Sequence, residues 1–311
     1  MERLIDLDAA RRIAADGLRL CLAGDEAAGL ALYHTIAKPG LFAKLPLGLH
    51  VDMLREAGRD GSAESLAALT LRQNGDLSRK AMRADATAAD KACEYEALLA
   101  RGLANPLMVN RYLGMLTALG RTAEVAAMFD AERLLHVVRI DGADAAAQAL
   151  LDREAGLEIG SSHSVRDMRK IPRLHDIAEF APLLAACRAE TNAYCARWAA
   201  SDHPLAQFVA GAFAIQAWGL ISRGEGYNSR HQHPHGWTTG VYYPAGLTPG
   251  IGGGSLCIGG WQDPAPPGWP VAQIRPEAGM LVLLPSYYVH WTDRLSAPGL
   301  RLSIPFNAVP V

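Results

Sequence analysis

The stretch Tyr227-Asn-Ser-Arg-His-Gln-His-Pro-His-Gly-Trp-Thr-Thr-Gly-Val-Tyr-Tyr243 combines three histidines with a segment typical of a β-strand. The second half of the stretch, residues 238–243, is rich in β-branched and aromatic residues, which favour strands. If the preceding residues are also extended, His231 and His233 point to the same face, because side chains alternate with a period of two. Two such imidazoles, roughly 7 Å apart at Cα, can converge on one metal ion. The alternative is a solvated loop that happens to be rich in histidine.

A further histidine and an arginine follow at intervals along the chain. Pro285-Ser-Tyr-Tyr-Val-His290 places one histidine just after the apolar segment 280–285, which is typical of a buried strand. Arg301 begins the last segment with alternating apolar residues, and Ser303 shares its face. A planar guanidinium at this position can hold the far carboxylate of a bound diacid. The ordered set therefore predicts a metal site with an anion-binding group beside it.

Composition and charge exclude several classes of partner. The chain has 311 residues and a formal net charge of −2, so it lacks the basic footprint of a nucleic-acid-binding protein. The sequence has no apolar run long enough to cross a bilayer, and its first residues lack the apolar region of a signal peptide. The five cysteines are scattered without a Cys-x-x-Cys motif, which favours free thiols in a reducing compartment. We therefore expect a cytoplasmic protein without nucleic-acid or membrane partners; the sequence is silent on oligomeric state.

Periodicity divides the chain near residue 150 and predicts an α+β fold. Residues 1–145 are rich in Ala, Leu, Glu and Arg with apolar spacings of three and four, which predicts helices throughout. Gly24 and Gly58 lie 34 residues apart in similar helix–turn–helix contexts, a spacing that resembles tetratricopeptide-type hairpins without clear Trp and Tyr signature positions. A plain helical bundle is the alternative. We predict a tetratricopeptide-like helical domain over residues 1–150 and a β-rich domain over residues 151–311.

Local signals mark helix ends in the first half of the chain. Thr87-Ala-Ala-Asp90 resembles a capping box, and Asn105-Pro106 places a capping residue before a helix-starting proline. Gly120 is expected to end one helix and Thr122 to cap the next.

The second half of the chain is expected to be mostly β, with one long helix over residues 180–200. His175 and His203 flank this helix and are expected to be surface or satisfied core histidines. Arg169 and Lys170, near the start of the domain, are expected to face water rather than substrate. Short apolar segments separated by Gly and Pro turns predict a sandwich or jelly roll. These expected strands cover residues 165–174, 215–222, 238–243, 255–258, 280–285 and 301–307.

Together these motifs resemble the iron(II)/2-oxoglutarate-dependent oxygenases, which have a double-stranded β-helix, or jelly-roll, core. Their pattern is His-x-Asp/Glu, a distant histidine and then an arginine, often within Arg-x-Ser. The text around the motifs is similar to that of a bacterial group of these enzymes with helical repeats ahead of the core. The similarity covers residues 165–311 and rests on Arg230-His-Gln-His-Pro, Gly240-Val-Tyr-Tyr243, Leu284-Pro-Ser-Tyr-Tyr-Val-His290 and Arg301-Leu-Ser-Ile-Pro-Phe-Asn307.

The resemblance implies a dioxygenase that uses Fe(2+) and 2-oxoglutarate. Three histidines would hold the iron, namely His231, His233 and His290. Arg301 and Ser303 would bind the C5 carboxylate of 2-oxoglutarate, with Tyr243 as a further donor. The implied reaction converts 2-oxoglutarate to succinate and carbon dioxide while a peptide, protein or small-molecule substrate is oxidised, most often by hydroxylation.

The sequence departs from the general pattern at His233, which stands where these enzymes usually have a carboxylate. Similar His-x-His text in the helical-repeat group favours His233 as a ligand. His235 is the alternative histidine partner, although its position after a proline favours a role near the metal or the substrate. Asp263 is a reserve carboxylate in the long Gly- and Pro-rich loop region.

Two other functions remain open at this stage. A cupin-like three-histidine metal enzyme would not use 2-oxoglutarate, and the Arg301-x-Ser303 pattern argues against it. A helical-repeat adaptor with an inactive barrel would not need an intact set of histidines, which the sequence retains.

Overall fold

The computed structural model describes residues 86–100, 104–162, 164–209, 211–233 and 236–310, with a few separate positions between residues 13 and 32. The chain forms two compact units, Met1–Gly120 and Arg121–Pro310. The predicted repeat around Gly24 and Gly58 lies outside the described residues. The tetratricopeptide-like domain and its boundary at residue 150 therefore stay predictions.

The described part of the first unit contains helices α6 (Ala88–Ala100) and α7 (Pro106–Ala118). The predicted capping box at residues 87–90 is confirmed, because each end residue donates its backbone N–H to the other's side chain, at 2.8 and 3.1 Å. Asn105 also caps α7 as predicted, since its Oδ1 accepts from the backbone N–H of Met108 at 2.9 Å.

The second unit begins with α8 (Thr122–Phe129) and α9 (Ala131–Leu134). The prediction that Thr122 caps α8 was wrong. Thr122 is the first helical residue, and Arg121 holds the N-cap position without a side-chain bond to the helix. The backbone of Gly120 has a left-handed φ of 70°, which fits its predicted place after the preceding helix.

The helical assignment of residues 1–145 was wrong at β1 (His136–Arg139), a strand that pairs antiparallel with a later strand of the unit. Val137 and Val138 are β-branched, and pairing with a buried neighbouring strand stabilises so short a segment. α10 (Ala143–Leu151) follows after a turn at Gly142, whose φ is 95°.

The remaining strands form two antiparallel sheets. The large sheet has the order β1-β10-β7-β12-β5-β3-β2, with β4 paired to β12 and β6 to β3, and the small sheet has the order β11-β8-β9. The strands are β2 (Ile159–Ser162), β3 (Val165–Ile171), β4 (Phe213–Ala217), β5 (Gly219–Ser222), β6 (Tyr227–Asn228), β7 (Thr238–Tyr243), β8 (Leu256–Gly259), β9 (Ala272–Ile274), β10 (Met280–Pro285), β11 (Val289–Thr292) and β12 (Arg301–Pro310).

Five of the six expected strands are confirmed with shifts of at most a few residues at their ends, whereas the sixth is interrupted. The expected strand over residues 215–222 forms β4 and β5, separated at Trp218. The backbone N–H of Trp218 donates to the carbonyl of Pro305 at 3.1 Å, so this residue still contacts β12 between the two strands.

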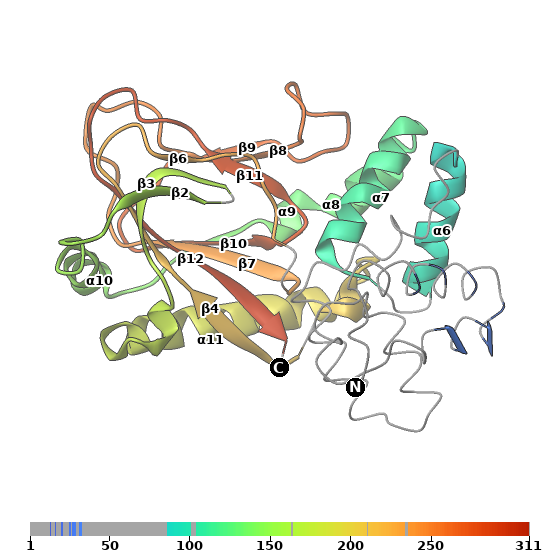
Figure 1. Ribbon diagram of the computed structural model, residues 1–311, viewed down its shortest axis with the longest axis horizontal. Helices are drawn as coiled ribbons and strands as arrows, with labels where there is room; N and C mark the ends of the chain where they lie inside the picture. The colour runs from blue at the N-terminus through green and yellow to red at the C-terminus, as the bar shows by residue number, and fades with distance from the viewer. Residues whose placement is uncertain are drawn as a thin grey trace, which may run out of the picture. The chain divides into compact units, whose positions relative to one another are not determined.

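Helix α11 (Ala181–Ala199) confirms the long helix predicted over residues 180–200 and runs along one face of the large sheet (Figure 1). Single-turn helices η2 (Leu174–Asp176) and η3 (Ala178–Phe180) precede it, and η4 (Ala206–Phe208) follows it.

Register decides which side chains of β7 face α11. Thr238 lies on that face, since its Oγ1 is 3.4 Å from Sγ of Cys195 in α11. Gly240 shares the face, and a Cβ there would lie 2.1 Å from the ring of Phe306, so only glycine fits. The alternation of a strand then turns Thr239 and Tyr243 to the opposite face.

The small sheet is drawn on the opposite side of the large sheet from α11 (Figure 1). Helices together with short antiparallel strands confirm the α+β class and are consistent with the predicted jelly roll. Within the described part of the chain, every helix is too short or too polar to cross a lipid bilayer.

Candidate metal centre

Two segments far apart in the sequence bring three histidines together. His231 forms an isolated antiparallel bridge with His290 of β11, with backbone N–H···O bonds of 3.0 and 2.9 Å. The backbone N–H of His233 donates to the carbonyl of Ser286 at 2.9 Å. Backbone hydrogen bonds thus hold the His-x-His segment against the chain around β11 at both of its histidines. These bonds fix the position of the backbone from which each imidazole extends.

The three rings converge closely enough to share one ion. One nitrogen from each of His231, His233 and His290 lies within 4.8 Å of the other two. The Nε2 atoms of His233 and His290 are 3.2 Å apart. An ion bound at about 2.0–2.1 Å from two nitrogens separates them by roughly 2.9–3.4 Å at octahedral or tetrahedral angles. The observed separation therefore lies in the range expected for two nitrogens bound to one metal ion.

Backbone carbonyls fix the tautomers of two of the histidines. Nδ1 of His231 lies 2.8 Å from the carbonyl oxygen of Ser229, and Nδ1 of His290 lies 3.0 Å from that of Tyr288. A carbonyl oxygen only accepts, so each Nδ1 must carry the hydrogen. Each ring therefore keeps its lone pair on Nε2. A carbonyl behind Nδ1 is the usual support of a metal-ligating imidazole.

Burial keeps these rings neutral. It lowers the pKa of His231 from 6.5 to about 4, and hydrogen bonds to backbone groups oppose the shift. Burial also lowers the pKa of His290 to about 3, with a smaller contribution from His231. Both imidazoles are uncharged near pH 7, which is the form that binds metals.

Arg301 lies at the start of β12 with its side chain almost completely buried, at 3% exposure. The guanidinium donates to the carbonyls of Asp293 and Gly226 at 3.3 and 3.2 Å, and one nitrogen lies 3.3 Å from Sδ of Met168. Among the described residues, no carboxylate forms an ion pair with it. Desolvation lowers its pKa. Tyr243 and Asp293 oppose this shift from a distance. A buried cation without a direct ion pair is costly, which points to an anion as its partner.

Ser303 and Tyr243 belong to the same face of the large sheet. Ser303 lies two residues after Arg301 on β12, and the registers of β7 and β12 place Tyr243 on the strand beside them. Burial raises the pKa of the Tyr243 phenol, and the nearby Arg301 charge opposes the shift. Both side chains are buried, so the predicted anion site combines one cation with two neutral hydroxyls.

The reserve carboxylate lies away from the three histidines. Asp263 is exposed and its carboxylate pairs with Arg230 at 3.6 Å, so it does not join the three histidines. Arg230 also covers the ring of Trp291, 3.6 Å from its centroid, which ties the loop containing Asp263 to β11. His235 lies outside the described residues.

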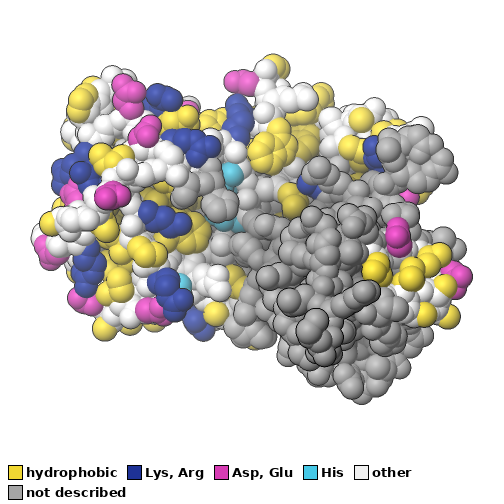
Figure 2. All heavy atoms as spheres, viewed as in Figure 1, with side chains coloured by type: hydrophobic (Ala, Val, Ile, Leu, Met, Phe, Trp, Pro, Cys, Tyr) yellow, Lys and Arg dark blue, Asp and Glu magenta, His cyan; other side chains and the backbone are white. Residues whose placement is uncertain are grey.

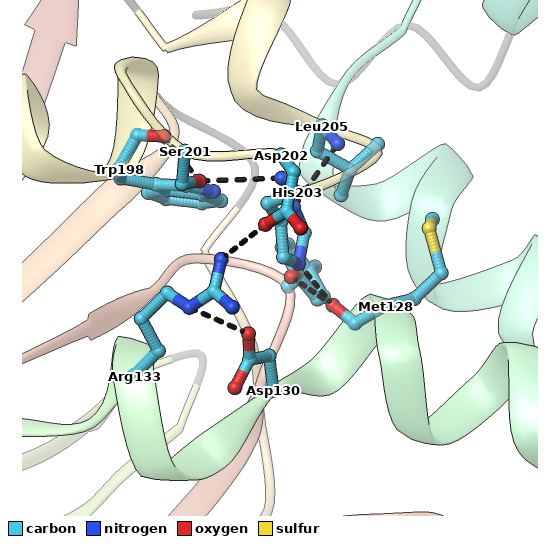
Figure 3. Close-up of polar contacts among 9 residues, drawn as sticks. Met128, Asp130, Arg133, Trp198, Ser201, Asp202, His203 and Leu205 are labelled. Atoms are coloured by element: carbon cyan, nitrogen blue, oxygen red, sulfur yellow. Dashed lines mark hydrogen bonds and ion pairs between the residues drawn. The ribbon is translucent and has the colours of Figure 1, made fainter.

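His203 behaves as the satisfied core histidine that the sequence predicts (Figure 3). One ring nitrogen, Nε2, donates to the carbonyl of Met128 at 2.9 Å, and the other accepts from the backbone N–H of Leu205 at 3.0 Å. Both nitrogens are thereby used, which leaves no lone pair for a metal. Desolvation by burial lowers its pKa.

Trp218 contacts the centre but was not predicted as a site residue. Its ring is stacked on His233, with centroids 6.0 Å apart and planes inclined by 29°. Trp218 belongs to no motif, and it lies in the break between β4 and β5. On the face shown in Figure 2, histidines appear only as small areas, and described basic and acidic side chains are interspersed.

No protein-family model and no curated protein sequence matches the chain. Among solved structures, the chain is similar to a prolyl hydroxylase from Trichoplax adhaerens in complex with a peptide of hypoxia inducible factor (15% identity, 62% of this chain and 92% of that chain, TM-score 0.41). It is also similar to a prolyl-4-hydroxylase from Pseudomonas putida (16%, 59% and 98%, TM-score 0.40).

A third similar structure is HygX from Streptomyces hygroscopicus with nickel, 2-oxoglutarate and hygromycin B bound (16% identity, 58% of this chain and 85% of that chain, TM-score 0.36). These values describe a distant likeness.

Proposed function

We propose that the protein is an iron(II)/2-oxoglutarate-dependent dioxygenase, and most specifically a hydroxylase of a peptide, protein or small-molecule substrate. The observation that carries the proposal is the combination of two features in one unit. Three imidazoles present nitrogens within 4.8 Å of one another, and a buried guanidinium lacks a described carboxylate partner. Burial of these polar groups is costly unless a ligand satisfies them, which supports a metal and an anion as their partners.

Each residue has a separate task in this proposal. His231, His233 and His290 hold the metal through uncharged nitrogens, and backbone carbonyls keep two of the rings in the binding tautomer. When bound, ferrous iron and 2-oxoglutarate supply the dioxygen chemistry that oxidises the substrate. A donor set of three neutral histidines leaves the centre one charge more positive than two histidines and a carboxylate, which favours the binding of an anionic cofactor.

Arg301 binds the C5 carboxylate of 2-oxoglutarate, and Ser303 and Tyr243 donate hydrogen bonds to the same group. The guanidinium already uses some of its donors on the carbonyls of Asp293 and Gly226, which hold the fork in place before the ligand arrives. Burial of Arg301 strengthens its attraction for a carboxylate, because water does not compete at the site.

The test is metal and cofactor binding followed by uncoupled turnover. Purified protein is titrated anaerobically with ferrous iron and 2-oxoglutarate while the visible charge-transfer absorption of the chelate is followed, and succinate is then measured under oxygen. We expect the wild type to show the absorption band and slow succinate formation. We expect His290→Ala to lose both signals and Arg301→Ala to lose 2-oxoglutarate binding.

Metal binding without any response to 2-oxoglutarate would favour the three-histidine enzyme that does not use this cofactor. An inactive barrel would bind neither the metal nor 2-oxoglutarate. Equal succinate from the wild type and both variants would remove the proposal.

A further inference from the structure

A second cation lies on the same face of the large sheet as Arg301, beyond a wall of apolar side chains. Lys170 of β3 pairs with Leu220 of β5, and Leu220 pairs in turn with Ser303 of β12. Residues that pair across antiparallel strands share a face, so Lys170 and Ser303 point to the same side of the sheet. Arg301 is the neighbour of Ser303 on that face.

The wall between the two cations is a small cluster of Val165, Met168 and Leu220 with Trp218 packed against it. Met168 contacts the Arg301 guanidinium at one end of this wall, at 3.3 Å. Trp218 forms the other end. The cluster therefore separates two positively charged positions by apolar surface.

Trp218 joins the second cation to the histidine centre. The Lys170 ammonium lies 5.3 Å from the centroid of the Trp218 ring, and the same ring is stacked on His233 with centroids 6.0 Å apart. A cation at this distance from an indole is held by the ring quadrupole. One aromatic ring thus stands between the ammonium group and a proposed metal ligand.

Lys170 differs from its neighbour Arg169 in its partners. Arg169 donates to the carbonyl of Leu157 at 3.2 Å and lies 3.5 Å from the carboxylate of Glu154. Lys170 is exposed, and it forms no ion pair with a described carboxylate. Desolvation by burial lowers its pKa, so part of the ammonium's water is already removed. An accessible cation that is partly desolvated and lacks an acid binds an incoming anion well.

We propose that Lys170 binds a carboxylate group of the substrate while Trp218 contacts the apolar part next to it, which places the substrate beside the histidine centre. The inference rests on the proposed function and adds a substrate class to it, namely a carboxylate-bearing compound or peptide side chain with an apolar body. Arg301 then holds the cofactor anion and Lys170 the substrate anion, at opposite ends of the Met168–Leu220–Trp218 wall.

The probe for this inference is a pair of matched ligands, 3-phenylpropionate and its uncharged amide. Binding of each is measured by ligand-observed NMR under anaerobic conditions with protein loaded with Ni(2+) and saturating 2-oxoglutarate, so that Arg301 is already occupied. We expect the acid to bind the wild type about tenfold more tightly than the amide, which corresponds to one charge-assisted contact. Retention of Ni(2+) and 2-oxoglutarate is measured first, by metal analysis and equilibrium dialysis.

Variants at Lys170 and Arg169 test whether the preference for the acid depends on the charge of Lys170 itself or on any positive charge of β3. Lys170→Met keeps most of the apolar stem and is expected to bind acid and amide equally. Lys170→Arg restores the preference for the acid. Arg169→Met removes a cation of the same strand that points to the opposite face, and it is expected to leave the preference unchanged.

Failure to bind the metal and cofactor and failure to prefer the acid would overturn different proposals. A wild type that does not retain Ni(2+) and 2-oxoglutarate would overturn the proposed function. A loaded wild type that binds acid and amide equally, or a Lys170→Met variant that keeps the preference, would overturn only the assignment of Lys170.

Discussion

The second unit contains two buried histidine sites that differ in what their ring nitrogens contact. At His203 both nitrogens have backbone partners, at 2.9 and 3.0 Å. At His231 and His290, Nδ1 lies 2.8 and 3.0 Å from a backbone carbonyl oxygen, and one nitrogen of each ring lies within 4.8 Å of nitrogens of the other two imidazoles in the cluster. Desolvation lowers the pKa at all three, so the pKa alone does not separate them. The number of lone pairs left over distinguishes a structural histidine from a candidate ligand.

Two arginines of the second unit show the same contrast. Arg133, close to His203, is half exposed and pairs with Asp130 and Asp202 at 3.0 and 2.6 Å (Figure 3). Arg301, on the face that carries Ser303 and Tyr243, is buried and lacks an acid partner among the described residues. Self-sufficient charges stabilise the fold slightly, whereas an uncompensated buried charge indicates a ligand site.

The largest expected effect is the loss of metal binding when a triad histidine is removed. We expect His290→Ala to weaken Co(2+) binding by about a hundredfold or more, since one of three ligands is lost. His203→Gln is the matched control, because it removes a buried histidine whose nitrogens are already used. Equilibrium dialysis with metal analysis measures both. Comparable losses of affinity in the two variants would erase the distinction between the sites.

The next largest effect concerns Arg301, where one substitution should change 2-oxoglutarate affinity and protein stability in different ways. Arg301→Met should weaken 2-oxoglutarate binding by about 2 kcal/mol, or roughly thirtyfold, because a charge-assisted contact is lost. The same change removes a buried cation without an acid partner, so the ligand-free protein should be as stable as the wild type or more stable. Urea denaturation measures the second quantity. A marked loss of stability would mean that the guanidinium is primarily a structural group.

A smaller effect is the pH dependence of stability in the metal-free protein. The folded pKa values of His203, His231 and His290 lie below the unfolded value of 6.5. The unfolded state therefore binds more protons below pH 6.5, so the free energy of unfolding falls as pH falls from 6.5 towards about 4. His231 and His290 each contribute on the order of 1.4 kcal/mol per pH unit in that window, and His203 contributes with the same sign.

Denaturation curves between pH 7 and 4.5 measure this slope, and His203→Gln should reduce it by the share of one histidine. A variant with the wild-type slope would show that His203 does not titrate in this way.

The smallest expected effect concerns Asp263. Asp263→Asn should leave Co(2+) affinity unchanged, because the carboxylate pairs with Arg230 and not with the three histidines. Its effect on unfolding should stay within about 1 kcal/mol, as for other exposed ion pairs. Metal affinity that drops tenfold would instead make Asp263 a ligand and revise the triad.

Prediction from sequence succeeded where the signal is local. The capping box at residues 87–90, the cap at Asn105 and the long helix near residues 181–199 depend on neighbouring residues, and all three are present. It failed at β1, because four residues in a helical context become a strand only through pairing with β10. It also missed the break between β4 and β5 at Trp218, which depends on contact with β12.

The sequence by itself determined which chemical groups are available and in what order: two histidines at His231 and His233, His290 after a buried strand, and Arg301 with Ser303 at the start of the last one. Only the tertiary structure decided that the histidine nitrogens approach within 4.8 Å, that Asp263 stays apart, and that Lys170 and Trp218 lie beside the centre. The physical reason is that residue type and spacing are local properties, whereas convergence depends on strand register and on pairings between distant segments.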